Sequence, residues 1–141
     1  MHVQAYLFFD GRCEEALDFY RTAIGAGDVN VMRYKDSPEK QPGMVPPGAD
    51  DKVMHSSFRV GDTLVMASDG HCKGQPKFEG LSLVINADSI AEAERLFGAL
   101  GNGGRADMPL TKTFFSPAFG MVHDRFGVSW MVIVASEMPS A

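Results

Sequence analysis

Apolar positions near the start of the chain follow two different spacings. Val3–Phe9 is a short run of aromatic and branched residues, which predicts a strand covered on both faces. From Cys13 to Ile24 the apolar residues lie three and four positions apart, which predicts an amphipathic helix. Gly25-Ala26-Gly27 ends that helix. Val29–Tyr34 then predicts a second strand.

A long polar segment follows. Lys35–Lys52 is rich in proline and glycine among charged residues, and it predicts a mobile loop that is either a lid over a site or disordered. Strands resume at Val53–Val60 and Thr63–Ser68, joined by a tight Gly61-Asp62 turn. Asp69–Lys77 predicts a second polar loop.

The order of elements then repeats. Leu81–Asn86 predicts a strand, and the capping box Ser89-x-x-Glu92 opens a helix over Ser89–Leu100. Three more strands are predicted at Arg105–Leu110, Phe114–Val122 and Val128–Val134. The chain is therefore predicted to be an α+β protein of two βαβββ modules, about residues 1–77 and 78–136, in a single domain spanning 1–141.

Composition narrows the classes of partner. The chain has 141 residues, 45% of them apolar, and a net charge of −5, which favours a globular domain and argues against nucleic-acid or anionic-membrane partners. No apolar stretch approaches the roughly 20 residues of a membrane span. The first residues are too short and polar a segment for a signal peptide. Cys13 and Cys72 form no CxxC pattern, so we expect a reduced, cytoplasmic protein.

Several motifs together indicate a family. They are Tyr6-Leu7-Phe8-Phe9-x-Gly11, Ala16-x-x-Phe19-Tyr20, Leu64-Val65-Met66-Ala67-Ser68-Asp69, Phe119-Gly120-x-Val122-x-Asp124-x-Phe126-Gly127-Val128 and Trp130-Met131. In these the chain resembles the vicinal oxygen chelate (glyoxalase/bleomycin-resistance/dioxygenase) superfamily. It is most similar to the PhnB-like branch, which carries a 3-demethylubiquinone 3-methyltransferase-like label. The resemblance runs from Val3 to Val134. It implies curved mixed sheets around a cavity, and a homodimer.

The metal enzymes of that superfamily take one ligand from each of four strand positions. The matching residues here are Ala5, Met66, Ser82 and Met131. A methyl group, two thioethers and a hydroxyl are poor ligands for a hard divalent ion, so we expect no metal. There is also no glycine-rich strand-to-helix turn of the kind that binds S-adenosylmethionine or dinucleotides. We therefore expect no cofactor, and methyl transfer is the weakest functional interpretation.

Two polar residues are catalytic candidates. His55 opens a strand and Asp69 ends its neighbour, so hairpin pairing is expected to bring them close. They are either a general base with its orienting carboxylate or a hydrogen-bonded pair that pins two loops. A peripheral metal site at Asp69, His71 and Cys72 would need a further ligand. Asp124 is expected to brace the turn before the last strand.

Other residues predict an apolar pocket with few polar anchors. The expected lining residues are Ala5, Met66, Ser68, Ser82, Phe115, Phe119 and Met131. Ser68 and Ser82 either donate hydrogen bonds into the pocket or are small residues at a crowded crossing. Most other aromatic residues, Phe8 among them, are expected in the core. Two functions follow: a metal-free protein that binds a small organic molecule, or a metal-independent isomerase, lyase or transferase that uses His55 and Asp69.

Overall fold

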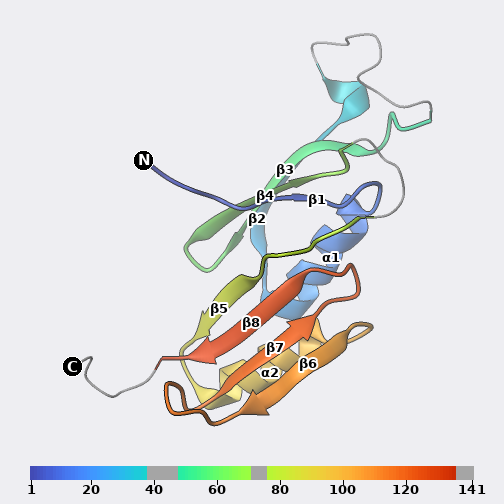
Figure 1. Ribbon diagram of the computed structural model, residues 1–141. Coiled ribbons are helices and arrows are strands. Elements are labelled where there is room, and N and C mark those ends of the chain that lie inside the picture. Colours follow the sequence, from blue (N-terminus) through green and yellow to red (C-terminus); the bar gives the residue numbers. More distant parts are fainter. Residues whose placement is uncertain (38–47, 71–75, 136–141) are drawn as a thin grey trace. The chain divides into compact units, whose positions relative to one another are not determined.

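The structure is a computed structural model that describes residues 1–37, 48–70 and 76–135. It contains two compact units, Met1–Lys77 (unit 1) and Phe78–Ala141 (unit 2). Unit 1 contains β1 (Tyr6–Phe8), α1 (Cys13–Ile24), β2 (Gly27–Arg33), the 3-10 turn η1 (Tyr34–Asp36), β3 (Val53–Val60) and β4 (Thr63–Ser68). Unit 2 contains β5 (Leu83–Ala87), α2 (Ile90–Leu100), β6 (Arg105–Thr111), β7 (Phe119–His123) and β8 (Ser129–Val134) (Figure 1).

Both units have the same sheet topology. The strand order is β1-β4-β3-β2 in unit 1 and β5-β8-β7-β6 in unit 2. In each sheet the first strand pairs in parallel with the last, and the remaining pairs are antiparallel. These two four-stranded mixed sheets with their two helices confirm the predicted α+β fold.

Each helix packs against one face of its own sheet (Figure 1). The apolar stripe of α1 is buried through Cys13, Ala16, Leu17, Tyr20 and Ile24, as its spacing predicts. The stripe of α2 is buried through Ala93, Leu96 and Leu100, and its N-cap Ser89 accepts a hydrogen bond from the Glu92 amide. In the described chain no helix covers the opposite face of either sheet, which is called the helix-free face below.

Strand β1 is shorter than predicted, and only one of its faces is covered. Its parallel register pairs Tyr6 with Met66 and Phe8 with Ser68. Alternation then buries Leu7 and turns Tyr6 and Phe8 to the helix-free face, where Phe8 is 57% exposed. The prediction that Phe8 belongs to the core is therefore wrong, whereas Phe9, Phe58, Phe126 and Trp130 are buried as expected.

Strand β7 begins at Phe119 instead of Phe114. The preceding residues form a turn in which the Thr113 hydroxyl accepts hydrogen bonds from the amides of Phe115 and Ser116. The Ser116 hydroxyl donates to the Val134 carbonyl at 2.6 Å. These side-chain bonds replace strand pairing over that segment.

Parts of both predicted loops lie outside the described residues. These are residues 38–47, which belong to the predicted lid Lys35–Lys52, and residues 71–75, which include His71 and Cys72. Within the described ranges, no helix is both long and apolar enough to cross a membrane.

Candidate functional site

An open cleft lies on the helix-free face of unit 2. Its volume is about 690 Å³, and its lining residues are Phe78, Glu79, Gly80, Leu81, Ser82, Val84, His123, Ser129 and Met131. The segment before β5 and the strands β5, β7 and β8 all contribute to it. The structure thus brings together two of the predicted lining residues, Ser82 and Met131.

One edge of the cleft is polar. The hydroxyls of Ser82 and Ser129 form a hydrogen bond of 2.7 Å. His123 is the register partner of Ser129 across β7 and β8, so the two side chains lie on the same face of the sheet. The Nδ1 atom of His123 forms a hydrogen bond with Oδ2 of Asp107 on β6. Two hydroxyls and an imidazole therefore meet beside the apolar side chains of the cleft.

Asp107 has two basic partners. Arg105 donates from Nε to its Oδ1 at 3.0 Å, and His123 is bonded to its Oδ2. The hydrogen bond from Arg105, followed by that from His123, lowers the pKa of the Asp107 carboxyl below its ordinary value. A register shift in the β6–β7 pairing between Ala106 and Met108 accompanies this arrangement. Asp107 is consequently held as a carboxylate against the His123 ring.

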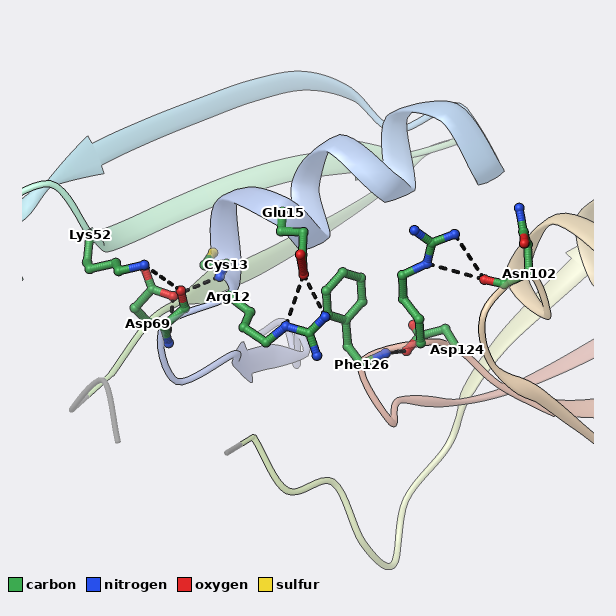
Figure 2. Close-up of polar contacts among 10 residues, drawn as sticks. Arg12, Cys13, Glu15, Lys52, Asp69, Asn102, Asp124 and Phe126 are labelled. Atoms are coloured by element: carbon green, nitrogen blue, oxygen red, sulfur yellow. Dashed lines mark hydrogen bonds and ion pairs between the residues drawn. The ribbon is translucent and has the colours of Figure 1, made fainter. Parts of the chain in front are cut away.

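The backbone around His123 is fixed by two neighbours. Gly104 approaches so closely that a Cβ there would lie 2.0 Å from the His123 carbonyl oxygen. On the other side, the buried Asp124 carboxylate accepts a hydrogen bond from the Phe126 amide at 2.9 Å (Figure 2). It also accepts hydrogen bonds from the Val128 amide at 3.1 Å and from Trp130 Nε1 at 2.9 Å. The predicted role of Asp124 as a turn brace is confirmed.

In unit 1, His55 is an exposed residue on the helix-free face. Its Nδ1 lies 3.0 Å from the Tyr6 hydroxyl, and the two ring centroids are 5.6 Å apart. Tyr6 also packs against Phe8, with 4.9 Å between centroids. His55 therefore belongs to an exposed aromatic group.

Asp69 is buried, and its carboxylate is engaged with backbone amides. Oδ1 accepts a hydrogen bond from the Cys13 amide at 2.7 Å (Figure 2) and another from the Gly11 amide at 2.9 Å. Oδ2 accepts a hydrogen bond from the Val53 amide at 2.7 Å. Asp69 thus pins the loop before α1 to the start of β3. The structure does not bring His55 and Asp69 together as an acid–base pair, since the described chain shows no hydrogen bond between them.

A nucleophilic role for the Cys13 thiol is also disfavoured. Cys13 is fully buried at the start of α1. Burial raises the pKa of its thiol to about 12, so the group stays protonated at neutral pH.

The remaining predicted lining residues lie outside the unit 2 cleft. Ala5 and Met66 are joined through backbone, because the Met66 amide donates to the Ala5 carbonyl at 3.1 Å. Ser68 is buried at the end of β4, and its hydroxyl accepts from the Gly70 amide. Phe115 and Phe119 pack edge to face, with centroids 5.1 Å apart.

The four positions that the resemblance aligns with metal ligands, Ala5, Met66, Ser82 and Met131, contain no carboxylate, imidazole or thiol. The register places Tyr6 beside Met66 and Val84 beside Met131. If these two register partners are taken instead, Tyr6 replaces Ala5 and Val84 replaces Ser82. This change adds only a phenol and an aliphatic group, so neither set of four residues is suited to a hard metal ion. Among the residues that the structure describes, no group of three or more His, Cys, Asp or Glu side chains is placed to hold a metal.

Sequence reasoning missed the pairing of His123 with Asp107, and it missed Ser129. The predicted strand Phe114–Val122 stops one residue before His123, which ends β7. The alternation Phe119, Met121, His123 was the available signal, because it places all three on one face of a strand. The contact with Asp107 also depends on the irregular register of β6. Pro109 within that strand signals an irregularity, but it does not say which residues become neighbours.

Comparisons with known proteins agree with this fold. The family model described as 3-demethylubiquinone-9 3-methyltransferase matches residues 1–133. The chain is similar to Protein YjdN of Escherichia coli K12, at 31% identity over 148 residues, with 99% of each chain covered.

Two solved structures are also similar over nearly their whole length. Protein PA1353 from Pseudomonas aeruginosa is 43% identical with a TM-score of 0.82, covering 96% of this chain and 98% of that one. The putative 3-demethylubiquinone-9 3-methyltransferase PhnB protein from Bacillus cereus is 26% identical with a TM-score of 0.77, covering 96% and 100%. A glyoxalase/bleomycin resistance/dioxygenase domain from Frankia, at 12% identity and a TM-score of 0.62 over 96% and 95% of the chains, matches in fold alone.

Proposed function

The chain belongs to the 3-demethylubiquinone-9 3-methyltransferase (PhnB-like) family, and from that premise we propose that it binds a small organic molecule in the cleft of unit 2. The single observation that carries this proposal is the cleft itself, an apolar hollow with a compact polar edge. Its volume of about 690 Å³ falls within the usual range for small-molecule sites.

Uncovered apolar surface supplies the driving force for binding. Leu81 is 50% exposed and Val84 is 53% exposed, and both line the cleft beside Met131. Covering one such side chain with a ligand contributes about 1 kcal/mol. The thioether of Met131 adapts readily to ligand shape.

The polar edge determines which molecules fit. The two serine hydroxyls share one hydrogen bond between them, so one O–H of the pair remains able to donate to a ligand. His123 adds a ring nitrogen beside them. The expected ligand therefore has an apolar body and one end that accepts a hydrogen bond, such as a carbonyl group.

Two matched methionine variants test the site. Met131→Gln places an amide in the cleft, whereas Met108→Gln makes the same change on β6 outside the lining residues. Binding of neutral ketones such as phenylacetone and cyclohexanone is followed by amide chemical-shift changes. We expect Met131→Gln to weaken binding about 10-fold and Met108→Gln to leave it unchanged. Equal loss in both variants would contradict the proposal.

The second candidate function is catalysis by His55 in unit 1. The observation that favours it is the contact between His55 Nδ1 and the Tyr6 hydroxyl on an exposed face. We propose that Met66, with Ala5 beside it, belongs to this surface, whereas Ser68 is buried. Asp69 would then support the strand ends, since its carboxylate accepts three backbone amides. His55→Gln separates the two functions, because binding in the unit 2 cleft should be unaffected while any turnover at His55 is lost.

A further inference from the structure

We propose that His123 and Asp107 act as an acid–base pair that moves a proton on the molecule bound in the unit 2 cleft. This inference rests on the proposed binding function, and it makes the protein a metal-independent isomerase of carbonyl compounds. The proposed proton transfer requires neither Asp69 nor His55.

The two nitrogens of the His123 ring have different surroundings. Asp107 is bonded to Nδ1, and a carboxylate accepts hydrogen bonds, so neutral His123 carries its proton on Nδ1. The other nitrogen, Nε2, then has a lone pair. His123 lines the cleft, and the described residues offer no partner to Nε2. The ring is thus a base oriented by a carboxylate, which is the arrangement that general-base catalysis requires.

The charged residues around His123 and Asp107 keep Asp107 ionised. Arg105 lies on the same strand as Asp107 and is bonded to its other carboxylate oxygen. Glu79 is the remaining charged residue of the cleft lining. Arg105 and His123 hold Asp107 ionised, as the lowered pKa of its carboxyl indicates. Asp107 therefore stays a hydrogen-bond acceptor across the neutral range and fixes the ring in one tautomer.

The hydroxyl groups of Ser82 and Ser129 provide a hydrogen-bond donor beside His123. Ser129 is the register partner of His123, and its hydroxyl is 2.7 Å from that of Ser82. A donor thus stands next to the base on the same face of the sheet. A ketone whose oxygen accepts from this pair has the carbon next to its carbonyl group close to the imidazole. Charge that develops on the oxygen during proton removal is then stabilised by the O–H donor.

The reaction balances without a further reactant. Nε2 of His123 takes a proton from the carbon next to the carbonyl group. The electron pair of the broken C–H bond forms the C=C bond of an enolate, and the carbonyl oxygen takes the negative charge beside the hydroxyl donor. The imidazolium then returns the proton to the same carbon, which restores the ketone, or to the far carbon of a conjugated enolate, which moves a C=C bond and isomerises the compound. Atoms and charge are conserved, and neither oxidant nor metal takes part.

Exchange of carbon-bound hydrogen for deuterium in D2O tests this step on the intact protein. Phenylacetone, cyclohexanone and beta-tetralone serve as probes, followed by proton NMR. We expect the protein to accelerate exchange next to the carbonyl group at least about 100-fold over buffer. His123→Gln should return the rate to that of buffer. His2→Gln changes an exposed histidine outside the cleft and should leave the rate unchanged.

Asp107 is a positioning residue, and its role has its own readout. Asp107→Asn should lower the exchange rate at saturating probe at least about 10-fold without changing the probe concentration at half-saturation. Nitrogen-15 NMR of the His123 ring should show the Nδ1–H tautomer in the unaltered protein and a mixture in the variant. A purely structural ion pair would change stability alone, so an unchanged tautomer and rate would overturn the role of Asp107.

Two failures are distinguishable. Probes that shift the amide signals of Met131 and Val84 without faster exchange would overturn the acid–base pair and leave the binding proposal intact. If no probe binds, both proposals fall. Accelerated exchange that persists in His123→Gln would show that another group is the base, and it would also overturn this inference.

Discussion

Gly104 directly precedes β6 and lies against the backbone at the end of β7. A methyl group at this position would stand 2.0 Å from the His123 carbonyl oxygen and 2.8 Å from the Asp124 carbonyl carbon. Both atoms belong to backbone held by the Asp124 hydrogen bonds, so the clash cannot be relieved by moving a side chain. The glycine is therefore required for the position of the candidate base His123.

We predict that Gly104→Ala lowers the free energy of unfolding by about 2 to 4 kcal/mol. Gly98→Ala is the matched control. Gly98 lies in α2 with open space around its missing Cβ, so alanine there should stabilise the protein by about 0.5 to 1 kcal/mol. Urea unfolding followed by circular dichroism measures both. Equal effects of the two substitutions would contradict this view of Gly104.

The ionisation of Asp107 makes a second prediction at this scale. Its folded-state pKa is lowered, so its pairing stabilises the fold at pH values above the ordinary carboxyl pKa of 3.8. That stabilisation is lost as the pH falls through the lowered folded-state pKa. We expect Asp107→Asn to be less stable than the unaltered protein at neutral pH, and the two stabilities to converge as the pH falls below the lowered folded-state pKa of Asp107. A stability difference that does not vary with pH would contradict the assignment.

At the scale of elements, the two helices begin in different ways. Helix α2 is capped by Ser89, whose hydroxyl accepts from the Glu92 amide at 3.1 Å. Helix α1 has Arg12 at its N-cap, without a side-chain cap of its own. The Asp69 carboxylate, from beyond β4, accepts from the amides of Gly11 and Cys13 instead. The start of α1 therefore depends on a residue more than 50 positions away in sequence.

We predict that Asp69→Ala costs about 3 kcal/mol of unfolding free energy, because three buried or half-buried amides lose their acceptor. Ser89→Ala should cost about 1 kcal/mol, the usual value for a local N-cap. Chemical unfolding of the two variants side by side provides the measurement. A smaller loss for Asp69→Ala than for Ser89→Ala would refute the bridging role.

Local pattern carried most of the information about these elements. The spacing of apolar residues predicted α1 with its observed bounds, and Ser89-x-x-Glu92 predicted the start of α2. β1 was misjudged because an apolar run on a half-covered strand has the same composition as one on a fully covered strand. The start of β7 was missed because the side-chain bonds of Thr113 and Ser116 are specific to the folded geometry.

The candidate site was predictable only in part for the same reason. Ser82 and Met131 were expected in a pocket, and both line the cleft. The hydrogen bond between Asp107 and His123 joins residues 16 positions apart across an irregular strand pair. The spacing of apolar residues cannot predict such a polar contact. The family resemblance could not supply it either, because one fold hosts many different sites.

At the scale of the whole molecule, exposed aromatic side chains favour self-association. Phe114 is 93% exposed and packs edge to face on Phe115, and the resemblance to the superfamily implies a homodimer. We predict that the protein sediments as a dimer at micromolar concentration and that Phe114→Ser weakens the dimer. Analytical ultracentrifugation decides this, and a monomer at every concentration would contradict the prediction. Val3→Ser, at another exposed apolar residue, is the control.

The parallel pairing of first and last strands has a consequence for biosynthesis. β1 can join its sheet only after β4 has been translated, and β5 must likewise wait for β8. Every strand pair lies within one unit, so all the partners of the first sheet have been made before β5 is synthesised. During synthesis, β1 therefore stays unpaired until unit 1 is almost complete. In the same way, β5 stays unpaired until unit 2 is almost complete. The exposed time of β1 and β5 on the ribosome is set by the rate of translation, and slow translation within either module prolongs it.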